Sequence, residues 1–374
     1  LGHIATISDF LEAHPGKQYL LTNINTIKEP THALVMTENG DIVPLTDVSN
    51  APFNATSNAV SNILFDPDIT PIAYTFAHKF DIHNAIVDPI RALDPIMNDI
   101  DGYEKFLLND AVAWMNFWQK LEGVYSGITE LDAAMVLESD RKKMHGKNFK
   151  PAFETIAGCN ENAAKIHTTA SNKMLEDGVL LVDAGSKLDE YTSDITRIFL
   201  LGCAKNISYE LKKAYTNTLK AHIAVVTEIF AKDMHASYLD QIARKYVHFD
   251  HALGHGVGKE DVHAYPAIRL DSNMPLKENM IIAIEPGFYV PGEFGIRLES
   301  MLQVIEHDEQ NYALKYLVFI PFEYDLIIYD QLEESERAWL SKFHQICYDK
   351  LKEHVDVSFL NAKTSKFIEY VKRD

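Results

Sequence analysis

Cysteine is scarce in this sequence. The three cysteines, Cys159, Cys203 and Cys347, are odd in number and widely spaced. This pattern fits neither a disulfide framework nor a zinc site built from paired cysteines. A reducing compartment suits such a chain, so we expect a cytoplasmic protein.

Long apolar runs are also missing. No run of the sequence approaches the roughly 18 to 20 residues that a helix needs to cross a bilayer. The segment that follows Leu1 lacks the apolar stretch typical of a secretory signal peptide. We therefore expect no membrane partner.

Basic residues are outnumbered by acidic ones. The 374 residues include 35 Lys and Arg against 54 Asp and Glu, which gives a formal net charge of −19. Without a local basic patch, this charge repels phosphate backbones, so nucleic acid is not an expected partner. Hydrophobic residues make up 47% of the chain, as in an ordinary globular protein with a buried core.

Length and turn residues predict the domain organisation. The chain of 374 residues exceeds the size of about 250 to 300 residues at which single cores stop growing. Short β-rich runs at 18–45 predict a small α/β unit, and Pro, Asp and Asn residues at 88–101 break the pattern after it. We predict a partial α/β domain at 1–98, a larger domain at 99–325 and a helical extension at 326–374.

The larger domain shows the same order of elements twice, a pair of helices followed by a hairpin. Apolar residues recur with a helical period from Gly102 onward, and Thr129 is a suitable N-cap for the next helix. The predicted elements are helices at 102–127 and 130–143, a hairpin of 180–185 with 193–202, two helices within 208–247, and a hairpin of 280–290 with 295–305. Two such halves facing each other would form one curved sheet covered by helices, with a cleft between the halves.

Two aspartates interrupt apolar strands of the first half. Asp183 lies in the run LLVDAG and Asp194 in TSDITR. A carboxylate buried in an apolar strand is costly unless a partner compensates its charge, and a cation is one such partner. An alternative reading needs no ligand: one aspartate lies in a turn and the other at a strand end.

The second half supplies one imidazole and two more carboxylates. His255 lies in GHGVG, Glu285 follows the apolar run MIIAI, and Glu299 ends GIRLE. Two divalent cations would neutralise the four carboxylates. Oxygen-rich ligands with a single imidazole favour Mn²⁺ or Co²⁺ over a structural zinc held by thiolates. We therefore expect two divalent ions, Mn²⁺ first, with Co²⁺ or Zn²⁺ as alternatives.

Several fragments resemble, in order and spacing, the signature of the pita-bread metallopeptidases, which include methionine aminopeptidase, prolidase and aminopeptidase P. The fragments are LLVDAG with SDITR, HALGHGVG with DVH, IEPGFY and FGIRLE. The runs FETIAGCNENAAKIH and LVFIPFEYDLIIYDQLEESERAWLSKFH are most similar to the eukaryote-like cytosolic aminopeptidase P subgroup with its C-terminal extension. The resemblance covers roughly residues 100–350.

This resemblance implies an α+β pita-bread fold with a pseudo-twofold repeat, preceded by a smaller, partly truncated α/β domain. It also implies five metal ligands, with Asp194 and Glu299 bridging the two ions. The five residues are Asp183, Asp194, His255, Glu285 and Glu299.

Four further residues match positions of the family's site that are not ligands. His167, His251 and His263 match three histidines, which with Glu285 would be catalytic. Arg297 matches an arginine that orients the bridging carboxylate and lines the pocket. The resemblance implies that the three histidines and Arg297 also bind the substrate.

The sequence departs from the family's pattern at three places. The usual Gly-Thr-Thr-Asp reads Tyr191 to Asp194, so its glycine is lost. The usual His-Glu pair reads His263-Ala264, which removes a supporting carboxylate. A segment with Trp and Arg is missing after residue 27, and we interpret this as a deletion or a missing loop in the N-terminal domain.

The function implied by the resemblance is hydrolysis of the bond between an N-terminal residue and a following proline. Two ions would activate a water molecule, Glu285 would accept its proton, and His263 would help to stabilise the oxyanion. His167 and His251 would protonate the leaving nitrogen. The alternatives are prolidase, which acts on Xaa-Pro dipeptides, methionine aminopeptidase, and, in a different class, a non-catalytic peptide-binding module on the same fold.

The segment 333–351 has the period of an amphipathic helix. Trp339, Leu340, Phe343 and Ile346 lie on one side of it. Packing against the helix's own domain would account for this face. A homodimer contact, which the resemblance also implies, is the alternative.

Overall fold

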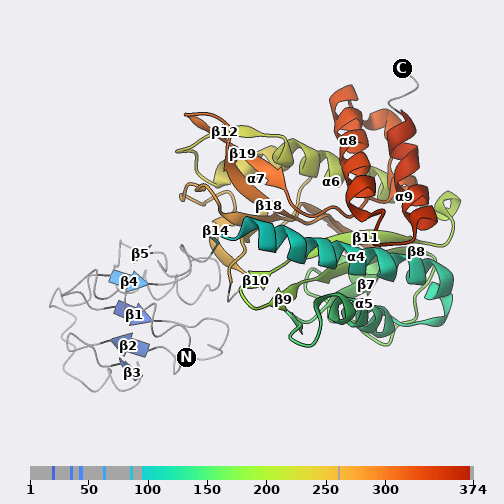
Figure 1. Ribbon diagram of the computed structural model, residues 1–374, viewed down its shortest axis with the longest axis horizontal. Coiled ribbons are helices and arrows are strands. Elements are labelled where there is room, and N and C mark those ends of the chain that lie inside the picture. Colours follow the sequence, from blue (N-terminus) through green and yellow to red (C-terminus); the bar gives the residue numbers. More distant parts are fainter. Residues whose placement is uncertain are drawn as a thin grey trace. The chain divides into compact units, whose positions relative to one another are not determined.

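The structure is a computed structural model (Figure 1). It describes residues 95–259 and 262–370, together with the backbone of five short strands nearer to the N-terminus. The chain forms two compact units, Leu1–Leu93 and Asp94–Asp374. The division into three domains remains a prediction.

Five short strands of the first unit form one sheet. They are β1 (Tyr19–Leu21), β2 (Leu34–Met36), β3 (Ile42–Pro44), β4 (Asn62–Leu64) and β5 (Ala85–Ile86), in the order β3-β2-β1-β4-β5. β1 is antiparallel to β2 and parallel to β4. The strands predicted within 18–45 are present as β1 to β3, whereas the predicted deletion after residue 27 lies outside the described residues.

The second unit begins with the two predicted helices, α4 (Ile100–Val124) and α5 (Glu130–His145). Thr129 and Asp132 form a capping box at the start of α5, which satisfies backbone N–H groups of its first turn. Gly146, with φ of +81°, follows the last residue of α5, in a conformation that glycine adopts without strain. Thr129 is therefore confirmed as the N-cap.

The first half of the second unit contains the predicted hairpin, with a smaller one at its end. The long pair is β8 (Gly178–Ala184) with β11 (Ile195–Leu201), antiparallel, and β7 (Ile156–Cys159) extends the sheet in the order β11-β8-β7. Between β8 and β11, β9 (Ser186–Leu188) pairs with β10 (Tyr191–Thr192), and β6 (Lys150–Pro151) pairs with β9. The inner hairpin was not predicted.

The helices predicted within 208–247 are α6 (Tyr209–Val226) and α7 (Ser237–Ala243). A strand that was not predicted, β12 (Ile229–Ala231), lies between them and pairs with β19 (Asn311–Tyr316). A strand of three residues is too short for an alternation of apolar and polar side chains to reveal it in the sequence.

The second half is built around a six-stranded sheet, in the order β12-β19-β18-β15-β13-β14. Its remaining strands are β13 (Gly254–Gly256), β14 (Ala264–Ile268), β15 (Ile281–Ile284) and β18 (Ser300–Glu306). The hairpin predicted for 280–290 with 295–305 is divided into two pairs, because β15 pairs with β18 while β16 (Gly287–Val290) pairs with β17 (Phe294–Arg297) in a sheet of its own. Pro286 lies at the division, and proline has no N–H to donate to a ladder.

The two halves form separate sheets rather than the single curved sheet that we predicted. They meet where the backbone N–H of Glu299 donates a hydrogen bond of 3.1 Å to the carbonyl oxygen of Thr196. The strand order thus places the end of β8, the start of β11 and the start of β18 beside one another.

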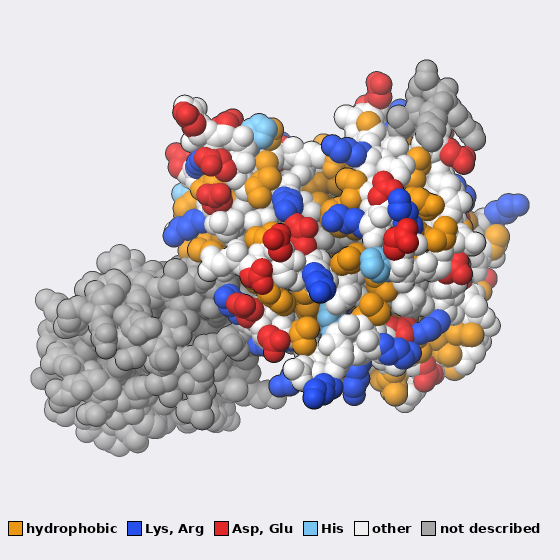
Figure 2. All heavy atoms as spheres, in the orientation of Figure 1, with side chains coloured by type: hydrophobic (Ala, Val, Ile, Leu, Met, Phe, Trp, Pro, Cys, Tyr) orange, Lys and Arg blue, Asp and Glu red, His pale blue; other side chains and the backbone are white. Residues whose placement is uncertain are grey.

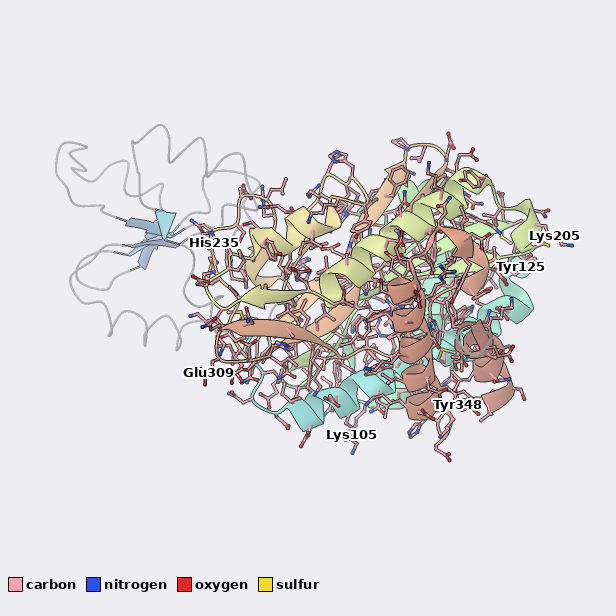
Figure 3. The ribbon with its side chains drawn as sticks, turned by 90° about the horizontal axis from the view of Figure 1, so that it is seen from above. Lys105, Tyr125, Lys205, His235, Glu309 and Tyr348 are labelled. Carbon is pink, nitrogen blue, oxygen red and sulfur yellow. The ribbon has the colours of Figure 1, made fainter. Side chains whose placement is uncertain are left out.

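The C-terminal residues form α8 (Glu334–Leu351) and α9 (Val357–Tyr370), which lie side by side (Figures 1 and 3). On α8, the ring of Phe343 lies 5.3 Å from that of Phe322 and stacks on Trp339 at 5.1 Å. Packing within its own unit therefore accounts for the apolar face of α8. Lys105 on α4, labelled in Figure 3, lies at the outer edge of the unit.

The surface of the second unit carries both signs of charge. On the face drawn in Figure 2, acidic and basic side chains are interspersed with hydrophobic ones. None of the helices in the described part of the chain is both long and apolar enough to cross a membrane.

Aromatic side chains of α4 hold the long strand pair in place. The ring of Phe199 on β11 stacks on Trp114 at 6.0 Å and meets the edges of Phe117 and Trp118 at 5.4 and 5.3 Å. All four side chains are almost completely buried. Such pairs add to the free energy of burial, so this cluster fixes β11 against the helix.

Truncating Phe199 tests the importance of this cluster. Phe199→Ala should lower the free energy of unfolding by about 3 to 5 kcal/mol, because a buried ring is replaced by a cavity. Met135→Ala, at a side chain that is 61% exposed, should change it by less than about 0.5 kcal/mol. Urea denaturation of both variants measures the difference, and equal losses would contradict the packing described.

Candidate metal centre

Carboxylates lie at corresponding points of the two halves, where one antiparallel strand pair gives way to the next. Asp183 is near the end of β8, and Asp194 directly precedes β11. Glu285 directly follows β15, and Glu299 directly precedes β18. Main-chain pairing is interrupted at these junctions, so side chains from all four strands can turn toward one place.

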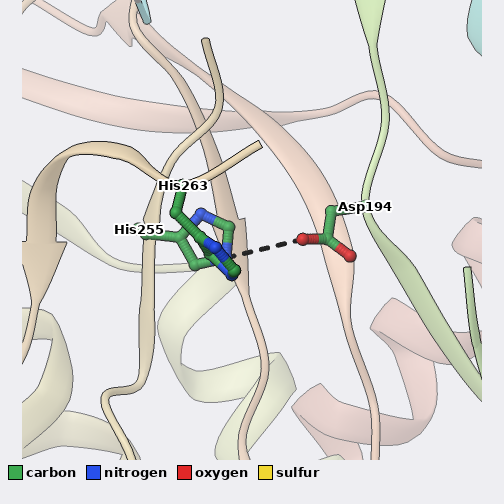
Figure 4. A group of neighbouring side chains, drawn as sticks. All are labelled: Asp194, His255 and His263. Carbon is green, nitrogen blue, oxygen red and sulfur yellow. Dashed lines mark ion pairs between the residues drawn. The ribbon is translucent and has the colours of Figure 1, made fainter. Parts of the chain in front are cut away.

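The structure brings the five predicted ligands together. Their ligand atoms form three overlapping groups, within each of which all atoms lie within 4.8 Å of one another. The groups are Asp183 with Asp194 and Glu299, His255 with Glu285 and Glu299, and Asp194 with His255 and His263. Figure 4 shows the last group, in which Nε2 of His255 lies 3.5 Å from Oδ2 of Asp194.

The tautomer of His255 is set by its backbone. Nδ1 lies 2.9 Å from the carbonyl oxygen of Gly256, and because a carbonyl can only accept, Nδ1 carries the proton. Burial, together with the nearby His263, lowers the pKa of His255 to about 3, so the ring is neutral at pH 7. The lone pair of Nε2 therefore faces two carboxylates, Asp194 at 3.5 Å and Glu285 at 3.8 Å. Such an arrangement is typical of a histidine that binds a metal through Nε2.

The carboxylates raise one another's pKa values. Burial and the charges of the neighbouring acids hold the pKa of Asp194 and of Glu299 well above the ordinary values. Burial raises the pKa of Glu285 to about 8, against the opposing charge of Arg297. Without added positive charge, three of the acids thus resist ionisation.

Arg297 is the nearest compensating charge. Its guanidinium donates to Oδ2 of Asp183 at 2.7 Å, whereas Oδ1 of Asp183 is buried with no hydrogen-bond partner among the described residues. One arginine cannot balance four carboxylates. The unpaired Oδ1 of Asp183, the lone pair of His255 that faces two carboxylates, and the excess of negative charge all fit a site for cations.

A chain of hydrogen bonds links Arg297 to His251. Arg297 donates to the hydroxyl of Tyr289 at 3.1 Å, and that hydroxyl lies 2.9 Å from Nε2 of His251. Nδ1 of His251 lies 2.7 Å from the carbonyl of Ala252, so it is the protonated nitrogen and Nε2 accepts from Tyr289. Burial lowers the pKa of His251 to about 4, which keeps the ring neutral.

The other two predicted histidines lie farther out. The side chains of His167 and His263 are exposed, in contrast to the buried ligands Asp194 and Glu299. The ring of His263 lies 4.5 Å from that of His255, and His167 is close enough to His251 to contribute to lowering its pKa. The exposed histidines thus lie on the solvent side of the buried acids.

Two residues that sequence reasoning missed connect the predicted ones. The hydroxyl of Thr196 donates to Oε2 of Glu299 at 2.7 Å and accepts from Nε of Arg297 at 3.2 Å. Tyr289 joins Arg297 to His251. Both residues lie inside quoted fragments, SDITR and IEPGFY, but only the three-dimensional contacts reveal what they bind.

One departure from the family's pattern has a local explanation. Tyr191, which replaces the usual glycine, donates its hydroxyl to Oδ2 of Asp99 and packs against the rings of Tyr103 and Phe106. The side chain is accommodated at the surface of the inner hairpin, and Asp194 remains with the other ligands. At the second departure, Ala264 is buried in β14.

Comparison with known sequence families gives two matches along the chain. The profile of metallopeptidase family M24 matches residues 108–306, more than half of the chain. The profile of the C-terminal region of peptidase M24 matches residues 310–367.

Curated relatives are similar over most of this chain. A probable Xaa-Pro aminopeptidase P of Laccaria bicolor is 29% identical over 334 residues, which cover 82% of this chain and 50% of that protein. Aminopeptidase P1 of Arabidopsis thaliana is 32% identical over 289 residues, which cover 71% and 43%. The chain thus spans about half the length of the curated relatives it matches.

Solved structures share the fold. An X-prolyl aminopeptidase from Caenorhabditis elegans, described as a cytosolic enzyme with a di-nuclear active site, has a TM-score of 0.71 at 19% identity and covers 98% of this chain and 70% of that one. Prolidase from Pyrococcus furiosus has a TM-score of 0.57 at 24% identity and covers 83% and 98%. The predicted α+β pita-bread fold is confirmed.

The raised pKa of Glu285 makes metal-free protein sensitive to pH. Between pH 6.5 and 8.5 the unfolded chain has already lost this proton, whereas the folded state, with a pKa of about 8, still holds it at the lower end. The contribution of Glu285 to the free energy of unfolding should therefore fall as the pH rises through this window. Mn²⁺ should raise the unfolding temperature more at pH 8.5 than at pH 6.5.

Thermal unfolding in chelator and in Mn²⁺ measures this effect. Buried His222 and His344 have pKa values lowered to about 3, so near the ordinary histidine pKa they add a slope of opposite sign, which fades at higher pH and is the same in the wild type and in the variant. Without metal, Glu285→Gln should remove the part of the pH dependence of thermal unfolding that Glu285 causes. The difference between the two proteins isolates this part from the contribution of buried Glu323, whose pKa is raised to about 7. An equal slope in the variant would contradict the assignment.

Proposed function

Since the chain belongs to metallopeptidase family M24, we propose that it is an aminopeptidase that hydrolyses the bond between an N-terminal residue and a following proline. The convergence of four carboxylates and a neutral imidazole carries this proposal. The relatives named as aminopeptidases P support the choice of substrate, because they are similar over 82% and 71% of this chain.

We propose that the five predicted ligands hold two divalent cations. When bound, the cations would polarise the scissile carbonyl and lower the pKa of a water molecule. Among the carboxylates, only Asp194 and Glu299 belong to two of the three groups of neighbouring ligand atoms, which supports bridging positions for them. The donor set favours Mn²⁺, with Co²⁺ or Zn²⁺ as alternatives.

Glu285 is suited to accept a proton from the attacking water. Its side chain is 19% exposed, more than those of Asp183, Asp194 and His255 at 11, 5 and 10%. It therefore lies between the buried acids and the solvent. A general base must reach both its proton source and bulk water, and this position provides both.

The histidines divide the remaining tasks. Both ring nitrogens of His251 are engaged, by Ala252 and Tyr289, so we propose that His251 lines the substrate site and holds the hydroxyl of Tyr289 in place. The exposed His167 is better placed to give a proton to the leaving nitrogen. His263, beside His255, would stabilise the oxyanion.

Arg297 would orient the acids and line the pocket. Its guanidinium contacts Asp183, the hydroxyl of Thr196 and the hydroxyl of Tyr289. Three fixed partners leave the side chain little freedom, as positioning of a reactive group requires.

We further propose a cytoplasmic location and a homodimer. The few, widely spaced cysteines support the first, as does the description of the Caenorhabditis elegans enzyme as cytosolic. The dimer rests on the family resemblance alone. Size-exclusion chromatography with light scattering measures it directly.

Replacing Glu285 tests the catalytic role. Glu285→Gln should keep the fold and reduce kcat for an Xaa-Pro peptide at least about 100-fold, because an amide cannot accept the proton. Glu306→Gln, on the same strand pair with a side chain that is 52% exposed, should retain activity. Steady-state kinetics at saturating Mn²⁺ compare them, and full activity of Glu285→Gln would reject its role.

A peptide panel tests the substrate class. With added Mn²⁺, peptides of the Arg-Pro-Pro type should lose their first residue, and peptides of the Met-Ala type should not. Cleavage of Xaa-Pro dipeptides alone would favour the prolidase alternative. Bound peptide without any cleavage, with or without Mn²⁺, would favour the non-catalytic binding module.

A further inference from the structure

A buried polar cluster adjoins Asp194 and lies outside the predicted site. It comprises Asp110 of α4, Arg141 of α5, and two serines, Ser186 and Ser193, all essentially inaccessible to solvent. Ser193 directly precedes Asp194 in the sequence. Placing a carboxylate and a guanidinium in a helix-packed core is costly, and apolar side chains would pack there equally well.

The directions of its hydrogen bonds follow from the donors available. The hydroxyl of Ser193 accepts the backbone N–H of Ser186 at 2.9 Å and donates its own proton to Oδ2 of Asp110. The hydroxyl of Ser186 accepts from Nε of Arg141 at 2.8 Å and donates to Oδ1 of Asp110. Both hydroxyls therefore converge on one carboxylate as donors.

Asp110 is held in the ionised form that this pattern needs. Burial alone would raise its pKa, but the hydrogen bond from His145 and the charges of Arg141 and His145 bring the pKa below its ordinary value. Nε2 of His145 lies 2.8 Å from Oδ1. Hydrogen bonds to an ionised acceptor are roughly twice as strong as neutral ones.

The cluster also fixes the backbone that leads into Asp194. The N–H of Ser193 donates to the carbonyl of Ser186 at 2.9 Å, so the two serines are joined in both directions across β9 and β10. On the same helix as Asp110, Tyr103 donates its hydroxyl to the carbonyl of Thr192 at 2.6 Å. The two residues before Asp194 are thus both tied to α4.

The charge of Arg141 reaches the metal centre as well. Its two terminal nitrogens have no hydrogen-bond partner among the described residues, and its guanidinium lies 5.4 Å from the ring of Phe149. Burial lowers the pKa of Arg141, whereas the carboxylates of Asp110, Asp183 and Asp194 favour its charged form. Arg141 is therefore coupled to two of the proposed ligands, although Asp110 offsets its charge within the cluster.

We propose that Asp110, acting through the hydroxyl of Ser193, is a positioning residue that sets the carboxylate of Asp194 for its bridging position between the two cations. This inference rests on the proposed metal site. Asp110 itself touches neither the cations nor the substrate. Partners of this kind orient a ligand, and their loss typically weakens metal affinity about 10- to 100-fold.

The test compares four variants of the full chain. Ser193→Ala removes the link, Ser193→Thr restores a hydroxyl, and Asp110→Asn keeps the shape but presents an amide N–H₂ to one of the two donating serines. Thr364→Ala is the control, because Thr364 is also a buried hydroxyl, bonded to the carbonyl of Leu360 on α9.

Three measurements apply to each variant: calorimetric titration with Mn²⁺, the d–d absorption spectrum of the Co²⁺-loaded protein, and the unfolding temperature. In Ser193→Ala and Asp110→Asn, the affinity for the second Mn²⁺ should fall about 10- to 100-fold and the Co²⁺ spectrum should change. Ser193→Thr should regain both properties. Thr364→Ala should lose thermal stability alone.

Wild-type affinity and spectrum in both Ser193→Ala and Asp110→Asn would overturn the inference, and so would equal losses of affinity in Thr364→Ala. These readouts need no peptidase activity. A wild-type chain that binds two Mn²⁺ but leaves Xaa-Pro peptides intact would therefore refute the proposed function and leave the positioning role to be judged on its own data.

Discussion

The repulsion among four carboxylates in a nearly dry interior is the constraint on which the rest of this structure depends. Asp194 and Glu299 are almost fully buried, and their neighbours hold both pKa values well above the ordinary ones. Arg297 supplies only one compensating charge. The folded state must therefore hold protons or bind cations at this point, and the surrounding contacts keep the acids close in spite of the repulsion. Thr196, which donates to Glu299 and accepts from Arg297, is one such contact.

The position of the acids follows from the way the two halves are built. In each half one antiparallel pair, β8 with β11 or β15 with β18, ends where a second pair begins, β9 with β10 or β16 with β17. At such a junction the ladder cannot continue, so backbone geometry changes and polar side chains can face inward without disturbing the apolar register. The halves meet at the hydrogen bond from Glu299 to Thr196. Two equivalent junctions are thereby brought face to face.

Local patterns in the sequence were enough to predict much of the fold. Helical period, the Thr129 cap and the apolar strands predicted the helices and the longer strands of the second unit because each depends on neighbours in the chain. The candidate ligands could be named because a carboxylate such as Glu285, directly after MIIAI, conflicts with its apolar surroundings. Asp110 could not be predicted as part of the site, because a single acidic residue within a long helix is typical of a surface position. Its partners Ser186 and Ser193 lie 76 and 83 residues away, and no local pattern encodes contacts at that distance.

Both ring nitrogens of His251 are hydrogen-bonded, and this limits the ways in which the proposed site could transfer protons. A side chain that is fixed by two hydrogen bonds keeps its place but has no proton to give, since Nδ1–H is bound to Ala252 and Nε2 accepts from Tyr289. The proposed proton transfer would then fall to groups nearer to solvent, such as Glu285 and the exposed His167. Buried residues with all their hydrogen bonds formed would hold the ligands, and residues that are at least partly exposed would exchange protons with water. In the proposed arrangement, the cluster of Asp110 would extend the first set one step farther from the reaction, which would keep the residues that hold the ligands apart from those that exchange protons.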